Sequence, residues 1–115
     1  MEIIKTSKEM TAKEKYAMTK NADISKMSTI KAGTKVNVKS WLLYEDVNQK
    51  TGEVQQILSI DTGKGVFATN SPTFVRDFFD MVDIFTDNGE DLDSFKMTGG
   101  TSKAGRAFIT CALAD

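Results

Sequence analysis

The order of the secondary-structure elements predicts a mainly β fold, a five-stranded barrel of the oligonucleotide-binding (OB) type with one helix between strands three and four. Three segments with strand character precede a long helix and two follow it, which is the element order of that barrel. The length of 115 residues is typical of one domain that buries a core without disulfides or metal.

The helix is the best-defined element and is predicted to span residues 70–89. Ser71 can cap its start, Pro72 fits the first turn, and Asn88-Gly89 favours a left-handed end. Apolar residues recur at steps of three and four, which indicates one face buried against a core. This apolar stripe consists of Phe74, Val75, Phe78, Met81, Val82 and Phe85.

Five segments have the alternation or the β-branched and aromatic content of strands. They are residues 34–46, 54–61, 66–69, 94–98 and 106–113. The first has no purely polar face, which is typical of a long barrel strand that bends between two sheets. A glycine-rich turn is predicted over residues 99–105.

The first 33 residues are predicted to form a basic N-terminal extension, followed by a barrel domain over residues 34–115. Thr11 and Glu14 have the spacing of a capping box, so a short helix is expected near residues 12–20. This helix either packs loosely on the barrel as a solvated element or acts as a basic arm that contacts phosphate or a neighbouring subunit.

The composition argues against an enzyme. The chain contains no histidine, so Ser-His-Asp and Cys-His chemistries are excluded. Its one cysteine, Cys111, lies in a predicted strand and is interpreted as a small buried hydrophobe rather than a reactive thiol. An acidic loop lacks the spacing of a calcium loop. It contains Asp87, Glu90, Asp91 and Asp93. We predict no catalytic residue, no metal and no cofactor.

Charge is distributed unevenly along the chain, although the formal net charge is only -1. Residues 1–50 contain ten lysines and six acidic residues, and residues 51–115 contain five basic and ten acidic residues. This balance does not by itself indicate a nucleic-acid partner, but it allows a local basic face. No apolar run approaches the roughly 18 residues of a membrane span. The N-terminus lacks a signal-peptide core, so we expect a cytosolic protein.

Two aromatic residues are candidates for stacking on nucleic-acid bases. Trp41, the only tryptophan, shares a strand face with Lys39, and it either stacks on bases or belongs to the core. In the third strand, Phe67 lies on the outer face if Val66 and Ala68 face the core, and in the core otherwise. Both alternatives stay open for both rings.

The candidate phosphate-binding cations lie next to these aromatic residues or in the predicted turns. OB folds bind oligonucleotides with strands two and three and with the loops that join strands one to two and four to five. The candidates are Lys39, Lys50, Lys64, Lys103 and Arg106. Each alone could be a solvated hairpin residue, but their joint placement favours binding.

Several segments resemble small proteins of bacteriophages and prophages of Gram-positive bacteria. They are residues 8–16, 66–78 and 101–111, the last reading TSKAGRAFITC. The resemblance is to phage single-stranded-DNA-binding proteins of the OB type. It implies cooperative coating of displaced strands during phage replication in the host cytoplasm, with phage or host replication proteins as partners. It implies no catalytic residue.

The sequence therefore predicts binding of single-stranded DNA without strong sequence preference, by base stacking and phosphate contacts. The alternative is a phage protein-interaction module that binds or inhibits a host protein, which the acidic second half of the chain would suit. Phe79 and Ile84 lie off the apolar stripe of the helix. They contact either the N-terminal segment or a second copy, so self-association is a further expectation.

Overall fold

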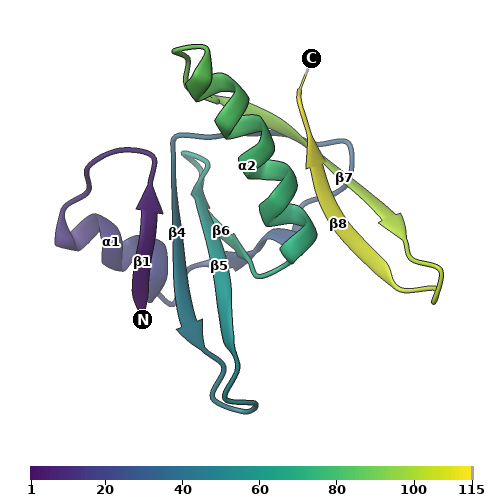
Figure 1. Cartoon of the computed structure of the whole chain (residues 1–115), viewed down its shortest axis with the longest axis horizontal. Coiled ribbons are helices and arrows are strands. Elements are labelled where there is room, and N and C mark those ends of the chain that lie inside the picture. Colours follow the sequence, from purple (N-terminus) through teal and green to yellow (C-terminus); the bar gives the residue numbers. More distant parts are fainter. Residues whose placement is uncertain (115) are drawn as a thin grey trace.

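The computed structural model describes residues 1–114 and contains two β-sheets and two α-helices (Figure 1), so the prediction of a mainly β fold is confirmed. Sheet A has the strand order β1 (Glu2–Thr6), β4 (Ser40–Val47), β5 (Val54–Asp61), β6 (Val66–Thr69), β2 (Ser25–Lys26). Sheet B has the order β3 (Lys35–Asn37), β7 (Ser94–Thr101), β8 (Ala107–Ala112). The helices are α1 (Ala12–Thr19) and α2 (Pro72–Asp87), and a 3-10 turn, η1, covers Met27–Thr29. No helix within residues 1–114 is long and apolar enough to cross a membrane.

The segment predicted as one first strand is divided between the two sheets. It breaks at Val38 and Lys39, with β3 paired to β7 in sheet B and β4 paired to β5 in sheet A. The Val38 N–H donates to the carbonyl of Asp93 (2.8 Å), and the Lys39 N–H donates to the carbonyl of Asp61 (2.8 Å). The chain therefore crosses between the sheets with both of these backbone donors satisfied.

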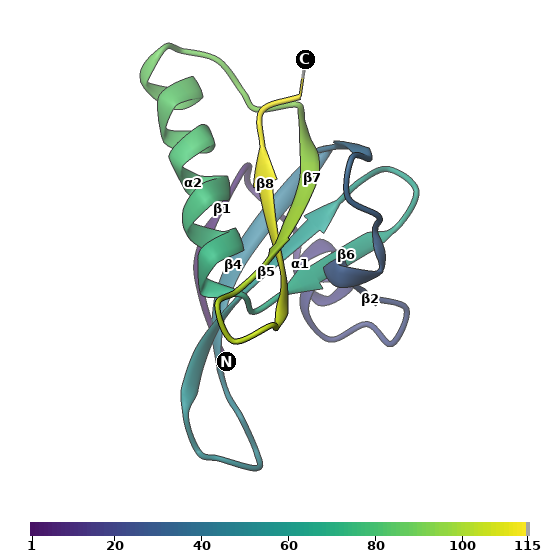
Figure 2. The same cartoon turned by 90° about the vertical axis from the view of Figure 1, so that its right-hand side faces the viewer.

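The two sheets do not close into the expected barrel. Strand β5 pairs in antiparallel orientation with β4 on one side and with β6 on the other. On its other side, β6 pairs in parallel orientation with β2. Within the described residues, β6 has no pairing with β8. The short strand Ser25–Lys26 therefore occupies the edge that closure would need. Figure 2 shows β7 and β8 crossing in front of sheet A.

Helix α2 begins and ends with the signals identified in the sequence. The Ser71 hydroxyl oxygen accepts the N–H of Phe74 (3.3 Å), Pro72 lies in the first turn, and Gly89 has φ +75°. Strand β7, in contrast, is longer than predicted. Gly99 and Gly100 continue the strand, so the turn to β8 is confined to residues 102–106.

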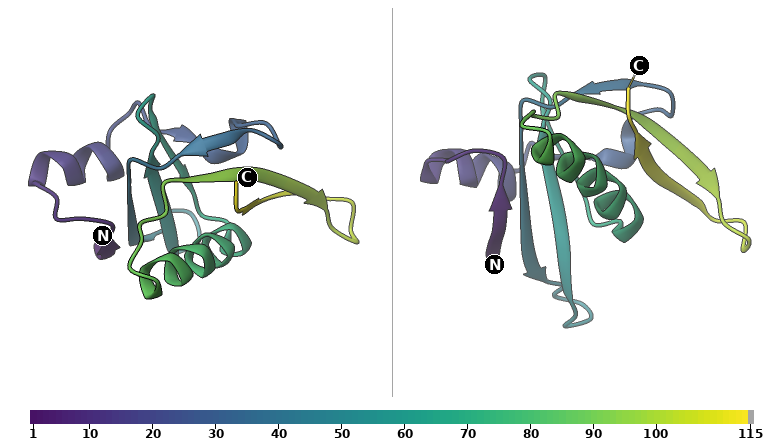
Figure 3. Two further views of the ribbon diagram at one scale, coloured as in Figure 1. Left: turned by 90° about the horizontal axis from the view of Figure 1, so that it is seen from above. Right: turned by 45° about the horizontal axis from the view of Figure 1, so that its top comes forward.

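The N-terminal 33 residues are packed against the rest of the chain. Strand β1 pairs with β4, and the capping box of Thr11 and Glu14 starts α1 as predicted. Met18 of α1 packs with Leu42 and Tyr44, which point to one face of sheet A, whereas α2 packs on the opposite face (Figure 3). Met27 is wholly buried in the main core. The N-terminal segment therefore contributes to both hydrophobic clusters.

An aromatic cluster joins α2 to both sheets. The Trp41 ring of β4 lies edge-on to Phe79 (5.0 Å between centroids) and Phe78 (6.3 Å). On the other side, Phe95 of β7 lies edge-on to Phe78 (5.7 Å) and Phe74 (5.8 Å). Such edge-to-face pairs add about 0.5–1.5 kcal/mol each beyond burial. This cluster is the centre of the core.

Truncation of Met27 tests whether the N-terminal segment is part of the folded unit. Met27→Ala should lower the free energy of unfolding by about 2–5 kcal/mol, because it leaves a cavity in the main core. The neighbouring exposed Ser28→Ala is the control, and we expect it to change stability by about 0.5 kcal/mol or less. Urea unfolding of both variants checks this, and equal midpoints would contradict it.

The thiol of Cys111 should be protected in the folded protein. The structure confirms that it is buried, and burial, aided by the charge of Asp77, raises its pKa to about 12. A raised folded pKa means that the unfolded thiol ionises first. The stability linked to this group is therefore complete below a pH of about 8.5 and falls as the pH rises toward the folded pKa.

A thiol reagent near pH ~8 should react slowly with the native protein and rapidly after addition of denaturant. Equal labelling rates in the two states would contradict the burial of Cys111.

Candidate nucleic-acid interface

The two candidate stacking residues lie on the core side of sheet A. Trp41 is 8% exposed and packs against α2. Phe67 is half-buried, lies opposite Ile60 and packs against the same cluster, whereas Val66 faces the other side with the second cluster. The interpretation of Trp41 as an open stacking face is therefore wrong, whereas Phe67 is half-buried against the core and its role in stacking stays a prediction.

Three of the candidate cations are exposed, but they do not form one group, because Lys39 and Lys64 lie at one end of sheet A and Lys50 lies at the other. Lys50 lies in the β4–β5 hairpin, and Lys64 lies in the β5–β6 turn at the opposite end of sheet A (Figure 1). Lys39 lies at the break between β3 and β4, beside a hollow of ≈ 630 Å³. Trp41 also reaches this hollow, which has lysines on one side and carboxylates on the other. The charged residues are Lys5, Lys8, Lys39, Asp83, Asp91 and Asp93. This mixed charge does not favour an anionic ligand.

The β7–β8 hairpin brings the other two candidates together. The Ser102 N–H donates to the Arg106 carbonyl (2.8 Å), and the Gly105 N–H donates to the Ser102 carbonyl (2.9 Å). Gly105 has φ +79°, a conformation that favours glycine. The hydrogen bonds define a short turn whose exposed residues include Lys103 and Arg106. The tip of this hairpin extends away from sheet A (Figure 3).

An aromatic ring lies next to these cations. Phe108 is 42% exposed and pairs across the strands with Gly100. A Cβ atom at Gly100 would come within 2.7 Å of the Phe108 Cζ atom, so the ring lies directly over the glycine backbone. Only glycine allows this close approach. The arrangement leaves a large apolar ring partly open to solvent beside two cations.

The same face of sheet B carries two further lysines. Phe95 and Met97 of β7 are buried, so Lys96, Thr98 and Gly100 point to the outer face by strand alternation. Lys96 lies directly opposite Lys35 of β3, and both are exposed. Two like charges in register destabilise a sheet by some tenths of a kcal/mol. We call this outer face the sheet B surface. It comprises Lys35, Lys96 and Phe108, and we include with them the exposed turn residues Lys103 and Arg106.

The base of the hairpin is fixed to α2. The Thr110 hydroxyl of β8 donates to the carboxylate of Asp77, and this hydrogen bond, with the Arg76 guanidinium, lowers the pKa of Asp77. One residue along, the buried Cys111 faces the Phe74 carbonyl. The hairpin therefore projects from a fixed base, which positions Phe108 and the cations of the tip.

The sequence predicted Lys103 and Arg106 but missed Phe108, Lys35 and Lys96. The signal was present in the pair Gly99-Gly100, which we had assigned to a turn. Read as strand, it places Phe108 opposite a glycine, the arrangement in which an aromatic ring covers bare backbone.

Comparison of the chain with protein-family models, with curated proteins and with solved structures finds no match in any of the three.

Proposed function

We propose that this protein binds single-stranded DNA without strong sequence preference through the sheet B surface. The observation that carries the proposal is the partly exposed Phe108 ring, held over Gly100 between the tip cations and the lysines of β3 and β7. Proteins of this class combine aromatic rings, on which bases stack, with cations that follow the phosphate backbone.

We further propose that the fold is an open variant of the OB type. The elements β3–β4, β5, β6, α2, β7 and β8 follow the order of that fold. In OB folds the strand two and three face and two loops bind the ligand. Here α1 covers the face of β4 and β5, while the β7–β8 hairpin, which corresponds to the loop between strands four and five, is exposed. The hairpin is therefore the more accessible part.

The biological setting that we propose follows from the resemblance to phage proteins. The protein would coat displaced strands during phage replication or recombination in the cytoplasm of the bacterial host. Other replication proteins of the phage or the host would be its partners. These assignments depend on the binding of single-stranded DNA and are wrong if the protein does not bind it.

A second candidate function, binding of a host protein, is favoured by the outer face of α2. Ile84 is 67% exposed there, and acidic side chains surround it on the helix. These are Asp80, Asp83 and Asp87, all exposed. An apolar residue within an acidic face suits a partner with a basic surface better than it suits DNA.

Removal of the Phe108 ring should weaken binding of oligo-dT. Phe108→Ala should raise Kd about tenfold, because stacking contributes about 1–3 kcal/mol per base. Phe108→Tyr should retain most of the affinity, and Ile84→Ala on α2 is the control for loss of an exposed apolar side chain. Fluorescence anisotropy of a labelled oligonucleotide measures each Kd. An unchanged Kd for Phe108→Ala would rule out the sheet B surface.

Binding should also depend steeply on salt. Each phosphate contact on a single strand contributes a slope of about -0.7 in a plot of log K against log salt. The Lys103→Gln/Arg106→Gln double variant should therefore reduce the slope by about 1.4. Titrations over a range of NaCl concentrations measure it. A slope near zero for the unmodified protein, together with nuclease-insensitive capture of a host protein that Ile84→Lys abolishes, would favour the second function.

A further inference from the structure

We propose that α1 provides a second contact for the same DNA strand, at the opposite end of the molecule from the sheet B surface. This inference rests on the proposed function. The contact consists of Lys13 and Tyr16, which lie three residues apart and therefore on the same side of the helix. Tyr16 is 60% exposed, and Lys13 is exposed beside it.

Helix α1 is held rigidly enough to present these side chains. The capping box fixes its first turn, and Met18 is buried against Leu42 and Tyr44. At its last turn, the Tyr44 hydroxyl donates to the Thr19 carbonyl (3.3 Å). Residues on the buried side thus anchor the helix, while the side chains of Lys13 and Tyr16 take part in no hydrogen bond or ion pair among residues 1–114. An aromatic ring presented beside a lysine on a fixed element is the combination that stacks on a base and contacts phosphate.

Two acidic groups near α1, Glu14 and Asp46, are engaged within the protein. Glu14 accepts the N–H of Thr11 (3.1 Å) and lies 3.5 Å from the ammonium of Lys8, and these contacts lower its pKa. Asp46 pairs with Lys20, which likewise lowers the pKa of Asp46. Among the described residues, no ion pair includes Lys13. The ammonium group of Lys13 is therefore available to a phosphate group.

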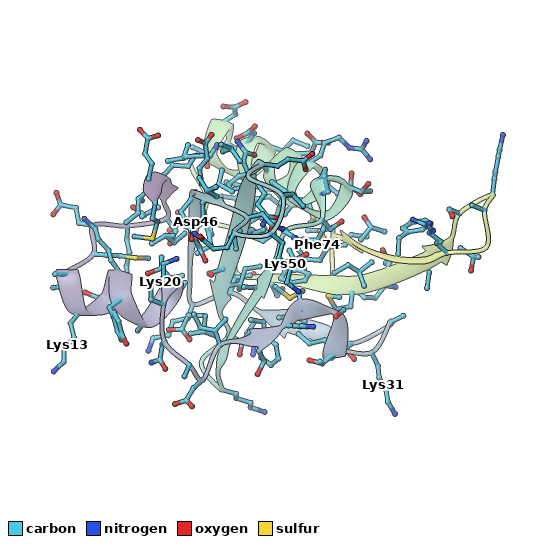
Figure 4. All side chains as sticks on the ribbon, turned by 90° about the horizontal axis from the view of Figure 1, so that it is seen from below. Lys13, Lys20, Lys31, Asp46, Lys50 and Phe74 are labelled. Carbon is cyan, nitrogen blue, oxygen red and sulfur yellow. The ribbon has the colours of Figure 1, made fainter. Side chains whose placement is uncertain are left out.

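The arrangement of the molecule allows one strand to reach both contacts. Helix α1 and the β7–β8 hairpin lie at opposite ends of a body whose largest extents are 40 and 39 Å (Figure 1). Figure 4 shows Lys13 and Lys31 projecting on the side away from α2, the helix that carries the exposed Asp80, Asp83 and Asp87. A polyanion that joins the two contacts therefore avoids the acidic face.

Oligonucleotides of two lengths distinguish the effects of the two contacts on binding. Site sizes of about 4–16 nucleotides are known for single OB domains, so we choose oligo-dT of about 5 and about 16 nucleotides. Tyr16→Ala and Lys13→Glu should each raise Kd about tenfold for the longer oligonucleotide and leave Kd for the shorter one within about twofold. Tyr16→Phe is the matched control for the ring. Lys50→Glu, which makes the same charge change in the exposed β4–β5 hairpin outside both contacts, is the control for net charge.

The outcomes distinguish this inference from the proposed function. Phe108→Ala should weaken the binding of both oligonucleotides. Tyr16→Ala should weaken the binding of the longer oligonucleotide only. A second outcome is that Phe108→Ala raises Kd for both oligonucleotides while Tyr16→Ala leaves both Kd values unchanged or raises both equally. In either case the proposed contact at α1 is wrong and the proposed function stands. If the unmodified protein binds neither oligonucleotide at low salt, both proposals are wrong. Circular dichroism of each variant verifies that α1 remains folded.

Discussion

The edge-on packing of Trp41 against Phe78 and Phe79 is the contact on which the rest of the structure depends. Sheet A and sheet B share only the continuous segment through β3 and β4, because β6 pairs with β2 rather than with β8. Without closure of a barrel, side-chain packing must hold the sheets together. Helix α2 does this, with Phe79 and Phe78 on Trp41 and with Phe78 and Phe74 on Phe95. Since Trp41 is only 8% exposed, a base cannot stack on its ring.

Local signals in the sequence predict most of the fold. The bounds of β5 and β6 agree with the alternation in the sequence, and Ser71 and Gly89 mark the ends of α2 because caps act within a few residues. That the two sheets do not close into a barrel could not be predicted from the sequence. It depends on Ser25–Lys26, two exposed residues without a periodic pattern, and on a parallel pairing with a strand some forty residues away. No local rule reports such a pairing.

The site was harder to predict than the fold. Residues 40–44 are all buried, because α1 covers one face of β4 and α2 covers the other. A strand buried on both faces shows no alternation from which to assign Trp41 to a face. The tip cations Lys103 and Arg106 were predictable, since glycine and polar residues mark the turn. Phe108 was not, because its exposure follows from the register that places it over Gly100.

Two features of sheet B are costly to folding and have a common explanation. Glycine within a strand costs roughly 0.5–1 kcal/mol relative to alanine, and the Phe108 ring over Gly100 offsets part of that cost. The position of the Phe108 ring is explained if the ring only covers the backbone of Gly100. That role does not explain the pair of lysines. Lys35 and Lys96 face each other on the same surface, where like charges repel. The single-stranded DNA that we propose as ligand would cover the exposed ring with a base and would neutralise the lysine pair with phosphate groups.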